Sequence, residues 1–573
     1  ASAVRFGLVL PLGRGESTPR SGTEVRAARR FVFSHDRVQQ AAYDLTPEPD
    51  RPRLHLAIGR SLQRALSDAD DGQLFEVVEH LNRGLEVMTD PEERAEVAAL
   101  DRRAGVLALR SAAPREALGF FQHALGALAS NAWSADYRGT LSLHELACEA
   151  ALLSGEEGTM RSLAATVAER ARDALDTVAV KEIGIAQRKS VRDLAGAVEE
   201  SLALLAELGV TFSQSTSDVV VLRELVRTKI ALRGKAMAAL EALPVLTDPR
   251  REAAMRVLGT LLLAAYYVRP GLLPFITFEL VRMRVEHGVT PTSAYGFSVY
   301  GLLLCTLGDH EQGYAVGAMA VRLGERLGDP RLHNVSLHLF QAHIRFWREP
   351  LRACADVERE VHRMGVELGD YEYAAFGAMM HCNMSVFTGD PLERVRETHR
   401  IYGAAVGTLQ QQTSQQQHAM TAQLVENLIL PDAGGAALKG PHYDESVMLA
   451  QLEADGDATL LYVHHAVKLV LAVFFADAET AETHREALAR YAKAAASSIW
   501  TFVGESYALP AELMLLHPPA SARGRELRGP RRAAALLSGM RGRLRLAKWA
   551  RGSPANFAHR LAPVDAGIAR VRG

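Results

Sequence analysis

Two short apolar runs near the start of the chain are the clearest strand signals in the sequence. Residues Val4–Leu10 and Arg30–Phe33 are rich in Val, Leu and Phe, and a Gly/Ser/Pro/Arg-rich loop separates them at 13–29. This pattern predicts a two-stranded wing. A helix is expected to follow, with Ser34 or Asp36 as its N-terminal cap. Its apolar positions lie about one turn apart, at Val38, Ala41, Ala42 and Leu45.

From about residue 74 onward, apolar segments with helical spacing alternate with short polar breaks. Four of the nine breaks contain Gly followed by Asp, and five contain Pro; these residue types end one helix and begin the next. The breaks lie at Ser154-Gly155, Gly209, Thr247-Asp248-Pro249, Arg269-Pro270-Gly271, Gly288-Val289-Thr290-Pro291, Gly308-Asp309, Gly328-Asp329-Pro330, Gly369-Asp370 and Gly389-Asp390-Pro391. The segments between them are long enough for one or two helices each.

Part of this helical region repeats itself. The shift that superposes Leu327-Gly328-Asp329 on Leu368-Gly369-Asp370 also superposes Phe346 on Phe387. A period of about 40 with two helices per unit is typical of a tetratricopeptide-like α-solenoid, somewhat longer than the usual repeat. Because one unit cannot bury its apolar face alone, neighbouring units are expected to stack.

The predicted fold class is therefore all-α: a tetratricopeptide-like α-solenoid of helical hairpins with a small N-terminal winged-helix-like α/β piece. The chain has 573 residues, which exceeds a single compact core, and its 6% aromatic content with abundant Ala, Leu, Glu and Arg favours helix over strand. We expect three segments: the winged-helix-like piece at 1–70, helical repeats at 71–430, and C-terminal helical repeats with a basic tail at 431–573.

The formal charge of −2 conceals a strongly basic C-terminus. Residues 521–573 hold 13 Lys and Arg against Glu526 and Asp565, a net charge of +11, so the rest of the chain carries −13. A basic patch of this kind binds nucleic acid or anionic membrane in some proteins. We favour a solvated face, or one that pairs with acidic groups, because apolar residues alternate with the charges at helical spacing. The candidate partner-binding residues are Arg531, Arg532, Arg541, Arg543 and Arg545.

The sequence lacks the motifs of the common catalytic sites. It contains no GxxxxGK[ST], GxGxxG, HExxH, GxSxG, HRDxxxxN or DFG string. We therefore expect no enzyme activity and no cofactor in this chain, with a helical enzyme of unfamiliar type as the least favoured alternative.

No metal site is predicted either. The four cysteines are widely separated in the sequence, which fits buried, reduced thiols better than a CxxC metal pair or a disulfide framework. His464 and His465 are adjacent, so on a helix they point about 100° apart and chelate one ion poorly. We expect one of them at the edge of the core and the other exposed. Tyr371 and Tyr373 are expected to pack in the core or a hairpin, with ligand stacking as the alternative.

Several strings resemble one family of signalling proteins. The most specific is FVFSHDRVQQAAY at 31–43, which resembles the FxFxHDRVQQAAY element that closes the ATPase module of large bacterial signalling proteins. Those chains join a serine/threonine kinase, an AAA/STAND-type ATPase, a tetratricopeptide-like region and often a sensor histidine kinase. WARGSPANF at 549–557 resembles a WAxxCPxNF element, with Ser553 in place of cysteine. Other similar strings are LFEVVEHLNRG (74–84), LAELGV (205–210), LPVLTDP (243–249) and GDHEQGY (308–314).

The resemblance covers nearly the whole chain but only the middle of the family's architecture. It implies that the N-terminal residues end the winged-helix part of an ATPase module, and that ATP or ADP binds in an ATPase core outside this chain. It also implies that His35 senses the bound nucleotide. The alternative for His35 is a purely structural position that satisfies amides at the helix start or the adjoining strand.

We therefore expect a non-catalytic sensor and scaffold that binds a protein or small ligand in its groove and relays that state to a nucleotide switch and a kinase. The runner-up is a free-standing adaptor. This interpretation argues against nucleic acid as a partner. Neither of the two most apolar stretches predicts a membrane span, because Val257–Val268 is too short and Lys468 interrupts Leu460–Ala476. A cytoplasmic location is expected.

Overall fold

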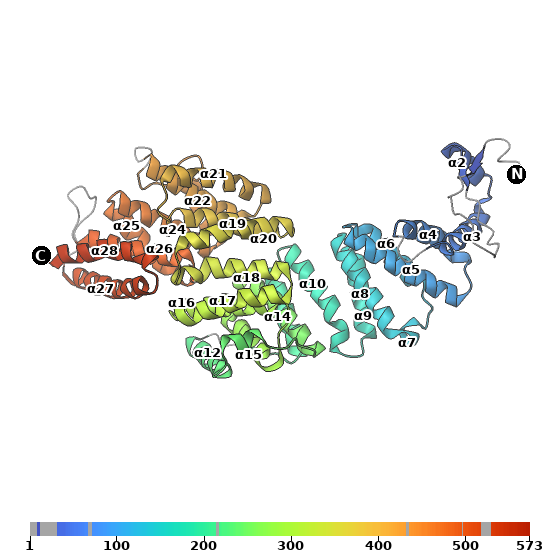
Figure 1. The fold of residues 1–573 in the computed structure, drawn as a ribbon, viewed down its shortest axis with the longest axis horizontal. Coiled ribbons are helices and arrows are strands. Elements are labelled where there is room, and N and C mark those ends of the chain that lie inside the picture. Colours follow the sequence, from blue (N-terminus) through green and yellow to red (C-terminus); the bar gives the residue numbers. More distant parts are fainter. Residues whose placement is uncertain are drawn as a thin grey trace, which may run out of the picture. The chain divides into compact units, whose positions relative to one another are not determined.

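The structure is a computed structural model that describes residues 8–11, 31–66, 71–213, 217–430, 435–495, 497–516 and 529–572. The chain divides into two compact units, Ala1–Val191 and Arg192–Gly573. This division falls at a different place from the boundaries expected at 70/71 and 430/431, which remain predictions about the sequence segments. Each unit is built of helical hairpins (Figure 1), which confirms the all-α, tetratricopeptide-like fold class.

The first unit begins with the predicted two-stranded wing. Strand β1 (Val9–Pro11) pairs antiparallel with β2 (Phe31–Phe33), so that Val9 lies opposite Phe33. The first strand was expected at Val4–Leu10, and residues 4–7 lie outside the described part of the chain. Its helices follow in order: α2 (Asp36–Asp44), α3 (Arg51–Gln63), α4 (Asp71–Arg83), α5 (Pro91–Arg110), α6 (Pro114–Ala127), α7 (Ala132–Ala135), α8 (Tyr137–Leu153), α9 (Glu157–Arg170) and α10 (Val178–Ser190).

The second unit holds the remaining helices. They are α11 (Leu194–Glu207), α12 (Asp218–Leu232), α13 (Met237–Glu241), α14 (Pro249–Val268), α15 (Leu273–His287), α16 (Ser293–Thr306), α17 (His310–Leu327), α18 (Pro330–His343), α19 (Leu351–Glu367), α20 (Tyr371–Ser385), α21 (Leu392–Leu409), α22 (Gln412–Ile429), α23 (Glu445–Asp455), α24 (Ala458–Phe474), α25 (Ala478–Tyr491), α26 (Ile499–Leu516), α27 (Gly529–Gly552) and α28 (Pro554–Arg572).

The predicted repeat is visible in the helix bounds. Helices α18 and α19 begin at Pro330 and Leu351. The shift found in the sequence moves these two positions onto Tyr371 and Leu392, the first residues of α20 and α21. The consecutive hairpins lie side by side in Figure 1. The repeat is thus a structural unit of two helices.

A recurrent turn connects many of these helices. At the end of α16, Gly308 adopts a left-handed conformation with φ of 82°, and the Asp309 N–H donates to the Leu304 carbonyl at 2.9 Å. The Asp309 carboxylate then accepts a hydrogen bond from the Gln312 N–H at the start of α17. One dipeptide thereby closes the first helix and caps the second. The same Gly-Asp turn occurs at Gly328-Asp329, Gly369-Asp370 and Gly456-Asp457.

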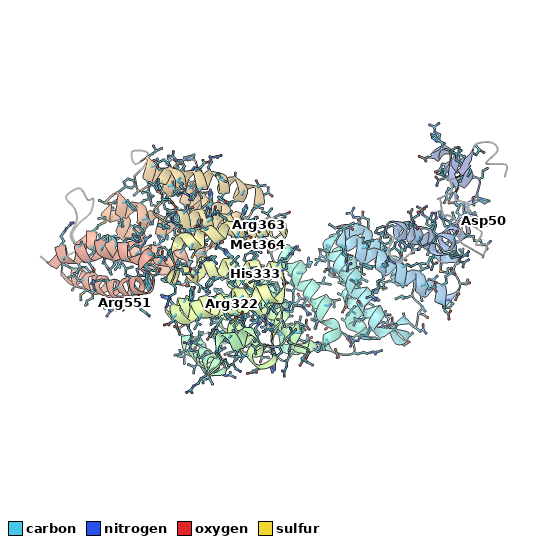
Figure 2. All side chains as sticks on the ribbon, in the orientation of Figure 1. Asp50, Arg322, His333, Arg363, Met364 and Arg551 are labelled. Atoms are coloured by element: carbon cyan, nitrogen blue, oxygen red, sulfur yellow. The ribbon has the colours of Figure 1, made fainter. Side chains whose placement is uncertain are left out.

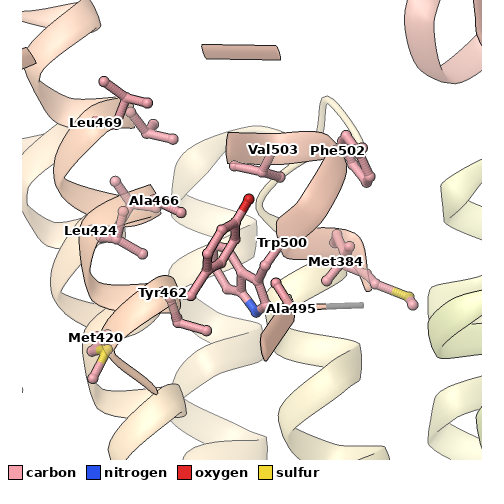
Figure 3. Packing of buried hydrophobic residues seen from close by; sticks show 14 of the residues in the cluster. Met384, Met420, Leu424, Tyr462, Ala466, Leu469, Ala495, Trp500, Phe502 and Val503 are labelled. Atoms are coloured by element: carbon pink, nitrogen blue, oxygen red, sulfur yellow. The ribbon is translucent and has the colours of Figure 1, made fainter. Parts of the chain in front are cut away.

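Helix α24 lies at the centre of the larger core. Every residue from Leu460 to Ala472 is buried, which is the burial expected of a helix that is apolar on all faces. Around it, side chains of α20, α22 and α26 interlock (Figure 3), and one contiguous cluster of buried residues draws on elements from α16 to α28. The labelled members of this packing are Met384, Met420, Leu424, Tyr462, Ala466, Leu469, Ala495, Trp500, Phe502 and Val503.

The exposed faces of the repeats carry ion pairs within and between helices. Arg363 of α19 pairs with Glu360 and Glu367 of the same helix, and Arg322 of α17 reaches Glu241 of α13 at 3.0 Å. Figure 2 shows the positions of Arg322 and Arg363 among the side chains. Exposed pairs of this kind contribute about 0–1 kcal/mol each. The stability of the units therefore depends on their buried clusters.

The last two helices of the second unit pack back onto the junction between α18 and α19 through the segment Trp549–Phe557. The indole of Trp347 lies against the rings of Trp549 and Phe557, with centroid distances of 5.0 and 5.8 Å. Trp347 also stacks on His310 at 4.1 Å. The string that resembles the family's WAxxCPxNF element is therefore a packing element between the C-terminal helices and the repeats.

Asn556 provides the polar part of this contact, and we call it the Asn556 clamp. Its Oδ1 accepts from the Leu351 N–H at 2.9 Å, and its Nδ2 donates to the carbonyls of Phe346 and Glu349 at 2.6 and 2.8 Å. Leu351 is the first residue of α19, and Pro350 before it offers no side-chain cap. Asn556 thus caps α19 although the two partners are far apart in the sequence.

Replacing Asn556 by Ala would leave three buried backbone groups without partners, since Asn556 is only 7% exposed. We expect the free energy of unfolding of the second unit to fall by about 3 kcal/mol, because each unmet buried hydrogen bond costs on the order of 1 kcal/mol. Urea titration followed by circular dichroism measures the change, with the exposed Asn131→Ala as control. Equal unfolding midpoints for Asn556→Ala and the unmodified protein would show that the clamp does not contribute to the stability of the unit.

In the first unit, a buried carboxyl group generates a second prediction. Asp101 of α5 is fully buried, and its Oδ1 accepts from Asn82 Nδ2 at 2.7 Å. Its Oδ2 and the Asn82 Oδ1 have no hydrogen-bond partner. Burial raises the pKa of Asp101 to about 7, despite the opposing hydrogen bond from Asn82.

Because this pKa is higher in the folded than in the unfolded chain, the unfolded state loses its proton first. Stability should therefore fall as pH rises from about 4 to 7 and then level off. Asp101→Asn removes the ionisation and supplies an N–H for Asn82 Oδ1. We expect it to stabilise the unit at pH 8 by on the order of 2–4 kcal/mol and to flatten its pH dependence. Urea midpoints at several pH values test this, with exposed Glu149→Gln as control, and an unchanged pH dependence in Asp101→Asn contradicts it.

Candidate functional site

The described residues from Leu8 to Leu45, which we call the N-terminal module, expose most of their apolar side chains. No residue of α2 is buried, although its apolar positions follow a regular helical stripe. Leu45 is 84% exposed. Four large apolar side chains in or next to the two strands are 40–48% exposed: Leu8, Leu10, Val32 and Phe33. In its described residues the module thus has no core of its own and presents an uncovered apolar face.

The structure gives His35 a capping role at the start of α2. Its Nδ1 accepts a hydrogen bond from the Arg37 N–H at 3.1 Å. The cap was expected at Ser34 or Asp36, and that prediction was wrong. The Ser34 hydroxyl instead donates to the Leu8 carbonyl of the paired strand at 3.2 Å, so it is engaged by the sheet.

A chain of hydrogen bonds connects the N-terminal module to the helices behind it. The Tyr43 hydroxyl at the end of α2 lies 3.1 Å from His55 Nε2 of α3, and His55 Nδ1 lies 2.8 Å from His80 Nδ1 of α4. Burial, with the charges of His80 and Arg83, lowers the pKa of His55. The neutral form of His55 is therefore favoured, in which one ring nitrogen donates and the other accepts. These side chains join α2 to α3 and α4.

A second uncovered apolar face lies on α12 in the other unit. Its outer residues are spaced as a helical stripe and are 48–79% exposed. They are Val219, Leu222, Val226 and Ile230. The opposite side of α12 packs on its own unit through Val221 and Leu225. We call these four outer residues the α12 stripe.

The basic tail is partly neutralised within the chain. Arg543 pairs with Asp565 at 2.5 Å, and Arg545 pairs with Glu505 at 3.2 Å. Arg532 Nη1 donates to the Leu516 carbonyl at 2.6 Å. Arg541 is exposed and lines, with Arg545, a shallow hollow on α27. The fifth predicted residue, Arg531, belongs to α27, but its side chain lies outside the described part of the structure. These contacts fit the interpretation of a face that pairs with acidic groups.

The two adjacent histidines of α24 are both buried. His464 is fully buried and His465 is 7% exposed, so the expectation that one of them is exposed was wrong. His484 of α25 joins them, and one ring nitrogen of each lies within 4.8 Å of those of the other two. Burial, with neighbouring charges, lowers the pKa of all three to about 3 or 4. Lys468, one turn further along α24, contributes a positive charge that lowers the pKa of His464 and His484.

The four cysteines are buried and free, as the sequence predicted. One of them, Cys382, lies beside His399 and His418, and this group was not recognised from the sequence. The sequence does contain a signal for this group: His399 and His418 are 19 residues apart, as are His465 and His484. In both cases the two residues face each other across a helical hairpin, with ring centroids about 5 Å apart.

The two tyrosines singled out at the start of α20 behave differently. Tyr373 packs against His338 and Phe376, as expected of a core position. Tyr371 is 56% exposed, so the expectation that it packs in the core or a hairpin was wrong.

Within the described residues, no helix combines the length and apolarity needed to cross a bilayer.

Comparison with known proteins places the chain next to a signalling protein. No protein-family model matches it. Over 419 residues, 65% of the chain, it is 20% identical to "Hybrid signal transduction histidine kinase G" of Dictyostelium discoideum. The chain covers only 12% of the length of that relative.

Two solved structures of low similarity cover most of the chain. One is "Structure of Naa15/Naa10 bound to HypK-THB", which is 12% identical in sequence. The alignment covers 90% of the present chain and 93% of the chain in that structure, with a TM-score of 0.23. A "Circular tandem repeat protein with novel repeat topology and enhanced subunit contact surfaces" is 13% identical and covers 91% and 97%, with a TM-score of 0.13. The informative likeness is therefore the sequence similarity to part of a signal-transduction histidine kinase.

Proposed function

We propose that this chain is the non-catalytic sensor and scaffold region of a multidomain signalling ATPase–kinase. The observation that carries the proposal is the uncovered apolar face of the N-terminal module. Its sequence at 31–43 resembles the element that closes an ATPase module, and a hairpin with one helix cannot bury a core alone. The similarity to a signal-transduction histidine kinase over 419 residues supports the same assignment.

In this proposal, the apolar face of the module packs against the ATPase core of the parent protein, which binds ATP or ADP. The hydrogen bond from the Arg37 N–H uses His35 Nδ1 as acceptor, so the proton of the neutral ring resides on Nε2. Nε2 is then the atom that would sense a nucleotide in the neighbouring domain. The contacts from Tyr43 to His55 and His80 transmit movement of the module to α3 and α4.

The signal enters through a partner that binds the helical array. The α12 stripe is suited to a protein partner, because an apolar helix face is covered by a complementary helix or groove. Binding shifts the nucleotide switch only if the partner prefers one arrangement of the helices over another. Kinase and ATPase activity belong to other domains of the parent, and this chain contributes no catalytic group.

A free-standing adaptor is the second candidate. The α12 stripe favours it as well, since recruitment of partners needs only an open apolar face. The two functions differ in their demands on the N-terminal module: a relay requires a partner domain of the same chain on that face, whereas an adaptor does not.

The coding sequence around this region distinguishes the two functions. A relay predicts an open reading frame that continues upstream into a segment with a GxxxxGK[ST] motif. In that parent protein, Leu10→Asp with Val32→Asp should change the dependence of kinase output on nucleotide by at least about 5-fold, the lower range of allosteric coupling. Leu153→Asp, an equally exposed apolar position of α8, is the matched control. A gene confined to this chain, or an output insensitive to the double substitution, would overturn the relay and leave the adaptor.

A further inference from the structure

We propose that Cys382, His399 and His418 form a zinc-binding site that ties together three consecutive helices of the repeat. The residues come from α20, α21 and α22, so the site links both helices of one hairpin to the first helix of the next. The inference is independent of the proposed signalling function.

The geometry of the three side chains fits a zinc ion. Cys382 Sγ and one ring nitrogen of each histidine all lie within 4.8 Å of one another. Zinc with bond lengths of about 2.3 Å to sulfur and 2.0–2.1 Å to nitrogen in tetrahedral geometry places its ligand atoms roughly 3.3–3.7 Å apart. The three ligand atoms would have to move closer together by about an ångström, which rotation of the side chains can provide. Three protein ligands leave a fourth position for water or a further ligand.

His399 supplies an observation that points to a ligand directly. It is 4% exposed, and neither of its ring nitrogens has a hydrogen-bond partner. The Cys382 carbonyl lies near enough to raise the pKa of the ring slightly, but it does not reach hydrogen-bond geometry. A buried imidazole with two unmet nitrogens is costly in an otherwise well-packed core. A metal bond would satisfy one of them.

The protonation states also suit a metal ion. Burial, assisted by the neighbouring histidines, lowers the pKa of His399 to about 3, and burial lowers that of His418 to about 4. Both rings are thus neutral at physiological pH, which is the form that binds metal. Burial raises the pKa of the Cys382 thiol, so zinc would have to displace its proton, as it does at other thiolate sites.

The surroundings hold His418 in place. Its Nε2 donates to the His399 carbonyl at 3.2 Å, which leaves the lone pair of the neutral ring on Nδ1. Gly403 lies one turn after His399 on α21, and a Cβ at that position would stand 2.4 Å from His418 Cε1. The absence of a side chain at Gly403 therefore makes room for the imidazole.

Charge distinguishes this site from the other histidine cluster. His464, His465 and His484 have comparable spacing, but two cationic side chains act on them: Arg490, and Lys468, which also pairs with Glu445 at 2.9 Å. Asp477 acts on His484 in the opposite sense. The pKa values of His399 and His418 respond instead to other histidines, among them His442. The group at Cys382 also offers the thiol, a softer ligand that favours zinc.

The test uses the full chain, stripped of metal with a chelator and then titrated with Zn²⁺ and with Co²⁺. We expect one tightly bound equivalent, and a cobalt spectrum that combines tetrahedral d–d bands with a thiolate-to-cobalt charge-transfer band. Cys382→Ser should abolish the charge-transfer band and weaken Zn²⁺ binding by at least about 10-fold. His399→Gln should also weaken binding. Cys354→Ser, at another fully buried cysteine, should leave both readouts unchanged.

Failure of the unmodified chain to take up an equivalent of zinc would overturn the site, and this result does not depend on whether any variant folds. A cobalt spectrum without a thiolate band would do so as well. Binding that survives Cys382→Ser but is lost in His465→Gln would assign the metal to the cluster on α24 and α25 instead.

Discussion

The side-chain amide of Asn556 satisfies three backbone groups at the junction between α18 and α19, and much of the second unit depends on this contact. In a tandem array, each hairpin packs mainly on its neighbours, so the ends are the weakest points. Here the C-terminal helices return to the middle of the array and cap α19. The rings of Trp347, Trp549 and Phe557 pack against one another at the same junction, and Asn556 is buried. Repeats and tail consequently share one core.

Sequence periodicity was sufficient for the local structure. The repeat shift carries the starts of α18 and α19 onto those of α20 and α21. A Gly-Asp turn marks the first start of each pair and a Pro residue the second. The wing and the burial of the four cysteines also followed from short-range pattern.

Contacts between distant residues were not predictable from pattern. Asn556 and Leu351 are 205 positions apart, and no local signal joins them. Amphipathic spacing shows that a helix has an apolar face but not whether another element covers it; the stripes of α2 and α12 both proved to be open. The sequence placed the cap of α2 at Ser34 or Asp36 and gave amide capping by His35 only as the alternative to nucleotide sensing. The group at Cys382 was missed because its members come from three helices.

The open faces and the shared core suggest how such a chain would act. In the proposed function, partner domains engage the N-terminal module or the α12 stripe, and the buried interior of each unit carries the response. In the second unit, a change in the packing of one hairpin would alter the packing of its neighbours, because the Asn556 clamp and the central α24 connect them. A scaffold that transmits a conformational change needs both features: surfaces that bind partners, and a core that passes the movement of one helix on to the next.

The cohesion of the second unit is most directly tested by hydrogen exchange at the Leu351 amide, whose N–H donates to Asn556 Oδ1. If the clamp holds repeats and tail in one core, this amide exchanges as slowly as those at the centre of α24, and only through unfolding of the whole unit. Fast exchange at Leu351 while α24 stays protected would show that the tail opens independently, and would contradict the account.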